Sequence, residues 1–371
     1  MFALFCGVLG GFCIWRGIWP LRLPKPVKIL WAAVTVVAAF NLFIQLRLPH
    51  EWVPKWLTLT LAWGYSVILL SCCFLALFEA AYWLTRVLCR VRKWNFSARA
   101  WQYARAAMFV PPILIASVGM VGGLRPPVIR EYELTLAGLP PELDGFTIAH
   151  LADIHSDKIT GPEQVRSIVS RTNALHPDLT VVVGDVVDRR LSVHRDAVRP
   201  LGELRARHGV FGVPGNHEYY AGYREWVDFF DSLGVTMLEN RHVLIAGGRI
   251  ALGGTTDPAA KNFDMEEPDP EKAFAGAPAG SFRILLAHQP KVAEKAAEAG
   301  VALQLSGHTH GGMIRGLDLI VAASNRGMVS GEYDYRGMKV FVSNGASLWK
   351  GFPVRIGRDS EIVLLRLRRK K

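Results

Sequence analysis

Cysteine is absent from the last two-thirds of this 371-residue chain. All five cysteines lie within the first quarter, at Cys6, Cys13, Cys72, Cys73 and Cys89. Residues 125–371 can therefore form neither a disulfide framework nor a metal site with thiolate ligands. The absence does not fix the redox compartment, because a domain without cysteine is compatible with either side of a membrane.

Acidic residues are scarce in the first third of the chain. Residues 1–124 contain 12 Lys and Arg but only 2 acids, Glu51 and Glu79, whereas residues 125–371 contain 31 basic and 30 acidic residues. The formal net charge of +11 therefore belongs almost wholly to the N-terminal third. A nucleic-acid-binding protein would carry its basic excess on a folded domain. Basic loops beside membrane spans explain this distribution better, so we expect a bilayer and no nucleic acid as partner.

Four apolar runs predict membrane-spanning helices in residues 1–124. A spanning helix needs about 20 mostly apolar residues. A buried core helix could explain one such run, but not four in succession with so few acids. The first run lacks a basic leader and a small-residue cleavage site, so we expect it to be retained rather than cleaved as a signal peptide. The expected spans of this transmembrane anchor are Phe2–Trp19, Ile29–Leu46, Leu57–Leu84 and Ala106–Leu124.

The charges of the loops predict an orientation. The two basic loops, which join the first span to the second and the third span to the fourth, lie on the same side of the membrane, and the positive-inside rule makes that side cytoplasmic. With four spans, the C-terminal domain then lies on the extracytoplasmic side of a bacterial inner or plasma membrane. The basic residues of the two loops are Arg22, Lys25 and Lys28, and Arg86, Arg90, Arg92, Lys93, Arg99 and Arg105.

The pattern changes after Arg125-Pro126-Pro127, where short strand-like runs begin to alternate with helical segments. We expect residues 125–145 to form a linker and a first strand, and residues 146–371 to form an α/β sandwich. The residues 257–280 are expected to be a loop, either a lid or, as we favour, a solvated excursion. The expected helices are Gly161–Ala174, Ala197–Arg207 and Arg224–Leu233. The expected strands are Tyr132–Leu136, Phe146–Ala152, Leu179–Val183, Val210–Val213, Val243–Ile245, Ile250–Leu252, Ile284–Ala287, Leu303–Leu305, Val340–Val342 and Ile362–Leu367.

Five polar motifs directly follow apolar runs, at the strand ends where an α/β sheet places functional loops. Their side chains offer nitrogen and oxygen ligands without sulfur, which suits Mn, Fe or Zn and fits Mg or Ca poorly. Two such ions about 3.5–4 Å apart can hold a hydroxide and stabilise an in-line displacement at phosphorus. Each motif alone could be a surface pair, a turn or a helix cap, but chance does not easily supply all five in order. The motifs are Asp153-Ile154-His155, Gly184-Asp185-Val186-Val187-Asp188-Arg189, Gly215-Asn216-His217-Glu218, Ala287-His288-Gln289 and Gly307-His308-Thr309-His310.

The order of these motifs resembles the calcineurin-like metallophosphoesterase superfamily over about residues 130–368. Later segments resemble its membrane-associated bacterial branch: Gly311-Gly312, Gly331-Glu332-Tyr333, residues 340–345, Pro353-Val354-Arg355 and Glu361-Ile362. That branch usually has Gln where this chain has Met313, a difference that concerns substrate preference more than catalysis. The resemblance implies a four-layer α/β sandwich, in which two mixed β-sheets are flanked by helices.

The resemblance also implies a role for each motif residue. His217 would be the general acid or a charge stabiliser at the leaving oxygen, Asp188 would orient His217, and Arg189 would contact a phosphate oxygen. The other histidines, His150, His176, His194, His208 and His242, receive no role. Two divalent metal ions would be held as follows: the first by Asp153, His155 and His310, the second by Asn216, His288 and His308, and both by Asp185.

The sequence therefore predicts a membrane-anchored dinuclear phosphoesterase that hydrolyses a phosphomonoester or phosphodiester by attack of a metal-bridging hydroxide. A lipid-linked substrate is one option, because a tethered domain meets lipids at high local concentration. The alternative reaction is that of a UDP-2,3-diacylglucosamine-type pyrophosphatase of lipid A synthesis, although that enzyme works at the cytoplasmic face. A non-catalytic metal-binding scaffold should have lost a ligand or the equivalent of His217. A transporter is disfavoured because Glu79 is the only acid within the spans. No oligomeric state is predicted.

Overall fold

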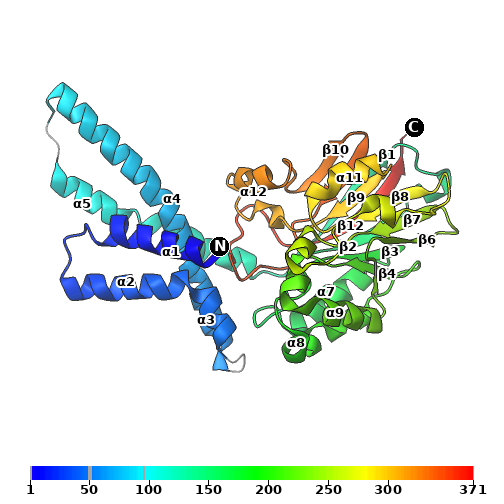
Figure 1. Ribbon diagram of the computed structural model, residues 1–371. Helices are drawn as coiled ribbons and strands as arrows, with labels where there is room; N and C mark the ends of the chain where they lie inside the picture. Colours follow the sequence, from blue (N-terminus) through cyan, green and yellow to red (C-terminus); the bar gives the residue numbers. More distant parts are fainter. Residues whose placement is uncertain (1, 49–51, 95–96, 371) are drawn as a thin grey trace. The chain divides into compact units, whose positions relative to one another are not determined.

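The computed structural model describes residues 2–48, 52–94 and 97–370, which fall into two compact units (Figure 1). The first unit extends to Gly122 and includes the short segment Lys350–Val354. The second unit comprises Gly123–Trp349 together with Arg355 and the residues after it. Glu51, whose charge entered the topology prediction, lies outside the described residues. Each unit is described by itself.

The first unit is entirely helical, but its helices differ from the four expected spans. In the described residues, only Lys55–Arg92 and the continuous stretch Ala98–Gly123 are long and apolar enough to cross a bilayer. The first expected span is a shorter helix, Ala3–Ile18, and the second is interrupted at Phe40. The elements are α1 (Phe2–Phe12), a π-helical turn (Cys13–Ile18), α2 (Lys25–Ala39), α3 (Asn41–Arg47), α4 (Lys55–Arg92), α5 (Ala98–Ala107) and α6 (Val110–Gly123).

Small residues and one ionic cluster hold these helices together. A Cβ atom placed on Gly10 would lie 3.2 Å from Cβ of Ala39, which shows how closely α1 approaches α2. Small residues allow such backbone contact between membrane helices. The carboxylate of Glu79 on α4 pairs with both Arg16 and Arg105, which come from two other helical segments. The only acid among the described residues of the first third is therefore buried in a cluster that links three segments.

The second unit contains two six-stranded mixed sheets. In the first sheet all neighbouring strands are parallel except the pair β12–β2. Its order is β1 (Val128–Leu136), β12 (Glu361–Arg369), β2 (Thr147–Leu151), β3 (Leu179–Val183), β4 (Val210–Val213) and β5 (Thr236–Met237). In the second sheet the four central strands are parallel and both edge strands are antiparallel. Its order is β10 (Gly331–Tyr335), β11 (Met338–Val342), β9 (Leu303–Ser306), β8 (Phe282–Leu286), β7 (Ile250–Gly254) and β6 (Arg241–Ile245).

Side chains on alternating positions of these strands point to opposite faces of each sheet. They form one core between the two sheets and further cores between each sheet and the helices that cover it. Ile148 and Val181 of the first sheet pack against Leu252 and Phe341 of the second sheet, so the two sheets face one another. The outer face of the first sheet is covered by α7 (Pro162–Asn173), α8 (Leu191–Val198) and α9 (Asn216–Ser232). The outer face of the second sheet is covered by α10 (Pro270–Ala273) and α11 (Ala293–Glu298), and Figure 1 shows α11 lying over this sheet. The predicted arrangement of two mixed sheets flanked by helices is confirmed.

Several expected elements of the second unit are wrong. The helix predicted over Ala197–Arg207 is misplaced: α8 spans Leu191–Val198, and Arg199–Glu203 is a 3-10 turn. Pro200 explains this change, because it lacks the N–H that a continuing α-helix needs. The segment expected to be a solvated loop contains a 3-10 turn (Pro258–Phe263) and α10, and it buries Ala260 and Ala273. No pattern in the sequence indicated β5, β10 or α12 (Asp318–Ser324).

Candidate metal centre

The five polar motifs meet at one edge of the sandwich because each follows the carboxyl end of a parallel strand. β2, β3 and β4 end just before the first three motifs, and β8 and β9 end before the last two. Backbone hydrogen bonds fasten the loops to one another. The N–H of Asp153 donates to the carbonyl of Gly184 (3.1 Å), and the N–H of Gly307 donates to the carbonyl of His288 (3.0 Å). Loops of both sheets thus converge on one site.

Three overlapping groups of ligand atoms form within this site. In the first, Nε2 of His155 lies 3.0 Å from Nε2 of His310, and Oδ1 of Asp153 lies 3.9 and 3.6 Å from these two nitrogens. In the second, Nε2 of His288 lies 3.2 Å from Oδ2 of Asp185, with His308 beside them. Oδ2 of Asp185 is also 3.8 Å from Nε2 of His155. His155, Asp185 and His217 form the third group, so Asp185, a member of the second group, also lies beside the first.

The lone pairs in these groups suit divalent cations. Nδ1 of His288 donates to the carbonyl of Val183 (2.8 Å), which leaves Nε2 as an acceptor aimed into the site. This Nε2 is buried and faces Oδ2 of Asp185 at 3.2 Å, and Oδ1 of Asn216 is buried without a hydrogen-bond partner. Nδ1 of His155 donates to Oδ1 of Asp188, which leaves Nε2 of His155 as an acceptor 3.0 Å from Nε2 of His310. The residues present thus fit the metals that prefer mixed nitrogen and oxygen ligands.

The electrostatics of the site favour a buried positive charge. Burial raises the pKa of Asp153 to about 6, and it lowers the pKa of His308 to about 3. Burial alone would also lower the pKa of His217, but the carboxylates of Asp185 and Asp188 outweigh it and raise this pKa to about 9. The negative field that stabilises a protonated imidazole here would equally stabilise a metal cation.

Five of the predicted metal ligands have left-handed backbone conformations, which are rare for residues other than glycine. Such conformations cost on the order of 1–3 kcal/mol each and concentrate at functional sites. Here they turn the chain sharply after a strand, so that the side chain enters the site. The φ values are 52° for Asp153, 44° for His155, 51° for Asp185, 72° for His308 and 50° for His310.

Close packing requires glycine at position 215. A Cβ atom on Gly215 would lie 2.3 Å from Oδ1 of Asp185 and 2.5 Å from the backbone nitrogen of the same residue. Those distances are far below any van der Waals contact, so a side chain at this position would displace Asp185. The glycine of the third motif therefore allows the second and third loops to approach one another.

Asp188 connects the two imidazoles nearest to it. Its Oδ1 accepts hydrogen bonds from Nδ1 of His155 (2.8 Å) and from Nδ1 of His217 (2.7 Å). Both rings therefore direct Nε2 toward Asp185. The structure brings Asp188 and His217 together, and Asp188 holds His155 as well.

The comparisons with known proteins agree with this geometry. A family model described as calcineurin-like phosphoesterase matches residues 146–312. A bovine relative named transmembrane protein with metallophosphoesterase domain is 32% identical over 384 residues, which cover 96% of this chain and 86% of that protein. The chain belongs to the calcineurin-like metallophosphoesterase superfamily. An uncharacterized metallophosphoesterase of Helicobacter pylori strain J99 is 36% identical and covers 67% of this chain and 66% of its own length.

The similarity to the bovine relative extends through the N-terminal third, so this metallophosphoesterase shares more than its catalytic region with it. Among solved structures, a 5'-nucleotidase precursor of Thermus thermophilus matches with a TM-score of 0.38 at 16% identity, covering 60% of this chain and 54% of its own.

Glu218 has a structural role that we did not predict from the sequence. Its buried carboxylate accepts hydrogen bonds from the backbone N–H groups of Asp185 (3.0 Å), Val186 (2.8 Å), Val187 (3.2 Å) and Gly215 (2.7 Å). Burial raises the pKa of Glu218 to about 7, and the nearby Asp185 adds to this rise. A Glu at the third position of a helix that contacts the residue before the helix is the signal of a capping box, and it could have identified this contact.

Arg355 is a second residue for which the sequence offered a motif but no role. Its buried guanidinium donates to Nδ1 of His310 (3.1 Å) and to the carbonyls of Asn344 (2.7 Å) and Ser347 (2.6 Å). Burial lowers the pKa of Arg355 to about 10, so the side chain remains cationic at neutral pH. Arg355 therefore fixes the ring of one metal-site histidine against the last loop.

Aromatic side chains border the metal centre beside His217. The ring of Tyr220 lies 5.5 Å from that of His217, and the ring of Trp349 lies 6.1 Å from it. Phe263 is 6.0 Å from Tyr220. Arg189 is half-buried next to Asp188, and its carbonyl accepts a hydrogen bond from Nε1 of Trp226 (2.9 Å).

The remaining histidines lie outside the metal-ligand groups of the described residues. His150 is fully buried, and Phe341 lies 6.0 Å from its ring. Nδ1 of His242 contacts the carbonyl of Ala273 (2.8 Å), and His208 stacks on Phe146. His194 is buried on α8, and His176 is exposed.

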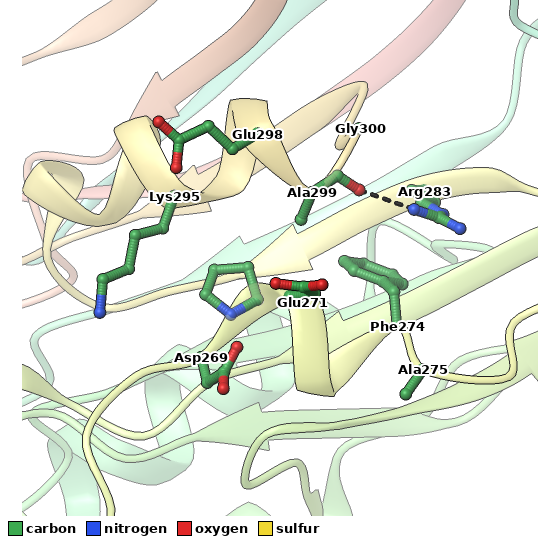
Figure 2. A pocket seen from close by; sticks show the side chains of 10 residues that line it. Asp269, Glu271, Phe274, Ala275, Arg283, Lys295, Glu298, Ala299 and Gly300 are labelled. Carbon is green, nitrogen blue, oxygen red and sulfur yellow. Dashed lines mark hydrogen bonds between the residues drawn. The ribbon is translucent and has the colours of Figure 1, made fainter.

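A wide hollow of about 790 Å³ lies elsewhere on this metallophosphoesterase, between α10 and α11 (Figure 2). Arg283 fills part of it: its guanidinium donates to the carbonyl of Ala299 (2.6 Å) and stacks over the ring of Phe274. None of the predicted site residues lines this hollow. The hollow is therefore separate from the five polar motifs.

Proposed function

We propose that this metallophosphoesterase hydrolyses a phosphomonoester or a phosphodiester at the site centred on Asp185. The observation that carries the proposal is the position of Asp185 within the second group of ligand atoms and beside the first. In this proposal residues 146–371 form the catalytic domain, and residues 125–145 link it to the anchor and supply its first strand.

The proposed ligands divide as the first and second groups do. Asp153, His155 and His310 would hold one ion, and Asp185 would contact both ions. Asn216, His288 and His308 would hold the other, a proposal supported by the unpartnered buried Oδ1 of Asn216. Bound divalent ions would supply Lewis acidity and lower the pKa of a water molecule. Manganese, iron and zinc are the metals that this ligand set suits best.

His217 is proposed to act at the leaving oxygen. Asp188 fixes its Nδ1, so Nε2 points toward the metal centre and lies 4.0 Å from Oδ2 of Asp185. The carboxylate of Asp188 stabilises the protonated imidazole, which can then donate a proton from Nε2 to an alkoxide. Arg189 is proposed to contact a phosphate oxygen through its guanidinium.

The substrate is proposed to be lipid-linked. This proposal is supported by the membrane association of the chain. Two observations indicate that association: the two long apolar helices, and the relatives from cattle and zebrafish that are named as transmembrane proteins. We retain a four-span anchor in a bacterial inner or plasma membrane, with an extracytoplasmic catalytic domain, as part of the proposal. A diacylglucosamine-type pyrophosphatase would instead need the domain at the cytoplasmic face. A non-catalytic scaffold is disfavoured because every predicted ligand is present.

The test is hydrolysis of p-nitrophenyl phosphate and bis-p-nitrophenyl phosphate by the full chain in detergent. The chain is first treated with a chelator and then assayed with and without added Mn²⁺, alongside Asp185→Asn. Asp228→Asn is the matched control, since it makes the same change at an exposed position of α9. We expect hydrolysis that requires metal, survives in the control and is lost in Asp185→Asn. Equal activity of the two variants, or activity without metal, would contradict the proposal.

A further inference from the structure

Helix α12 exposes an apolar face that nothing in the proposed chemistry uses. Leu319 and Ile320 are 76% and 68% exposed, the highest values among the large apolar residues of positions 125–370. Leu317, just before the helix, is 44% exposed, and no residue of α12 is buried. Leaving neighbouring aliphatic side chains in water is unfavourable, and contiguous exposed apolar surface commonly marks an interaction site.

This helix is fastened to the loop that carries the last two metal-site histidines. A Cβ atom on Gly312 would lie 2.4 Å from Cβ of Asp318, so the start of α12 packs directly on the residue two positions after His310. Oδ2 of Asp318 also pairs with Nη2 of Arg358 (2.7 Å). The apolar face is therefore held at a defined place beside the metal centre.

The charges around α12 are basic. Arg315 and Arg326 flank the helix, and both are exposed, although Arg326 also pairs with Glu294. Asp318 is the only acid from position 315 to position 326, and Arg358 neutralises it. An apolar centre with cationic ends is the pattern of helices that lie in the membrane interface, where arginine complements anionic headgroups.

We propose that α12 inserts Leu317, Leu319 and Ile320 into the surface of the bilayer to which this chain is anchored. The insertion brings the metal centre to the level of the lipid phosphates. The area argues for a bilayer rather than a protein partner, because a stable protein interface needs about 800 Å² on each side, and three partly exposed aliphatic side chains supply far less. A tethered domain needs only weak insertion, since the anchor keeps the bilayer at high effective concentration. The docking does not depend on the proposed catalysis.

The direct test uses a fluorophore that reports lipid contact in the full chain. Cys73, the exposed cysteine among the described residues, is first replaced by Ser, and an NBD label is attached at Ile320→Cys. Ser170→Cys, at an exposed position of α7, is the matched control site. The protein is reconstituted into phosphatidylcholine vesicles with and without phosphatidylglycerol, and quenching by lipids with a doxyl group near the headgroup is measured.

We expect a blue-shifted emission and several-fold stronger quenching at position 320 than at position 170, increased by the anionic lipid. Equal quenching at the two sites would overturn the proposal. A blue shift without doxyl quenching, together with a dimer in detergent, would also overturn it and would assign α12 to contact between two copies of the chain.

A second arm separates docking from catalysis. The double variant Leu319→Ser/Ile320→Ser is compared with Val193→Ser, which alters another exposed aliphatic residue, on α8. Hydrolysis of p-nitrophenyl phosphate should stay unchanged, while hydrolysis of a phosphoester lipid in vesicles should fall roughly tenfold in the double variant alone. An equal fall with both substrates, or none with the lipid, would contradict docking. If the parent chain hydrolyses neither substrate, the proposed function fails, and the quenching result still decides the docking proposal.

Discussion

At the scale of single residues, the candidate centre depends on side chains that hold the predicted ligands in place. Asp188 orients two imidazoles, Arg355 contacts a third, and Glu218 gathers the backbone of two loops. Partners of this kind typically contribute 10- to 100-fold to metal affinity or activity. They are therefore the residues at which a small change should have a large effect without removing a ligand.

Glu218→Gln should lower activity by about 10- to 100-fold and weaken metal binding, because the neutral amide is a poorer acceptor for four N–H groups than a carboxylate. Glu225→Gln, at an exposed position of the same helix, is the control. Metal affinity measured by competition with a fluorescent chelator distinguishes positioning from a general loss of folding. Identical metal affinities in Glu218→Gln and Glu225→Gln would contradict a role of Glu218 in positioning the metal ligands.

His150 should make the second unit sensitive to acid. Burial lowers the pKa of His150 to about 3, against about 6.5 for the unfolded chain. Between these values only the unfolded state takes up the proton, so stability is full above pH 6.5 and falls as the pH decreases. The loss should reach about 2 kcal/mol at pH 5.

The measurement for His150 is hydrogen exchange of the β2 amides, followed by mass spectrometry and corrected for intrinsic rates. The free energy of opening should fall between pH 7 and pH 5 in the parent and in His176→Leu, an exposed histidine control. In His150→Leu this dependence should decrease by about one proton. An unchanged slope in His150→Leu would show that other groups cause the acid sensitivity.

At the scale of elements, short apolar runs predicted the central strands well. The predictions for β3 and β4 agree with the structure at both ends, and those for β7, β8, β9 and β11 fall within one or two residues. A strand buried on both faces must be apolar at every position, and this gives a signal that does not depend on distant contacts. All five motifs could be placed because they follow such strands.

The missed elements lack that signal for identifiable reasons. β10 is a polar edge strand with no buried residue, and β5 has two residues. The break at Phe40 lies directly before Asn41, whose side-chain amide donates to the carbonyl of Ala38, and a prediction from mean hydropathy does not reveal it. The contacts of Glu218 and Arg355 join segments far apart in sequence, and only the folded chain shows which backbone groups they reach.

The cluster of Glu79 with Arg16 and Arg105 should be the main polar link between the helices of the first unit. Removing one partner of a buried ionic group typically costs about 3–5 kcal/mol, because the remaining charges lose their compensation. Glu79→Ala should therefore lower the thermal unfolding temperature of the helical part in detergent, as followed by circular dichroism. Thr60→Ala, an exposed position of the same helix, should leave it unchanged, and a similar temperature for both variants would contradict the role of the cluster.

At the scale of the whole molecule, the asymmetry of charge and cysteine matches the division into two units. The basic, cysteine-containing third is helical, and the nearly neutral remainder without cysteine forms the sandwich. Composition could predict this organisation because a bilayer and an aqueous core demand different residues. The number of membrane spans was harder to predict from composition, because it depends on where the apolar runs break and not only on how apolar they are.

The dinuclear centre is the central claim, and metal stoichiometry tests it most directly. We would load the full chain with Mn²⁺, remove loosely bound ions and measure the manganese per chain by mass spectrometry of the element. The parent and Asp228→Asn should each retain two ions, His310→Ala should retain one, and Asp185→Asn should lose affinity for both because Asp185 is the ligand proposed to contact both ions. One ion or none in the parent, or two in Asp185→Asn, would contradict the account.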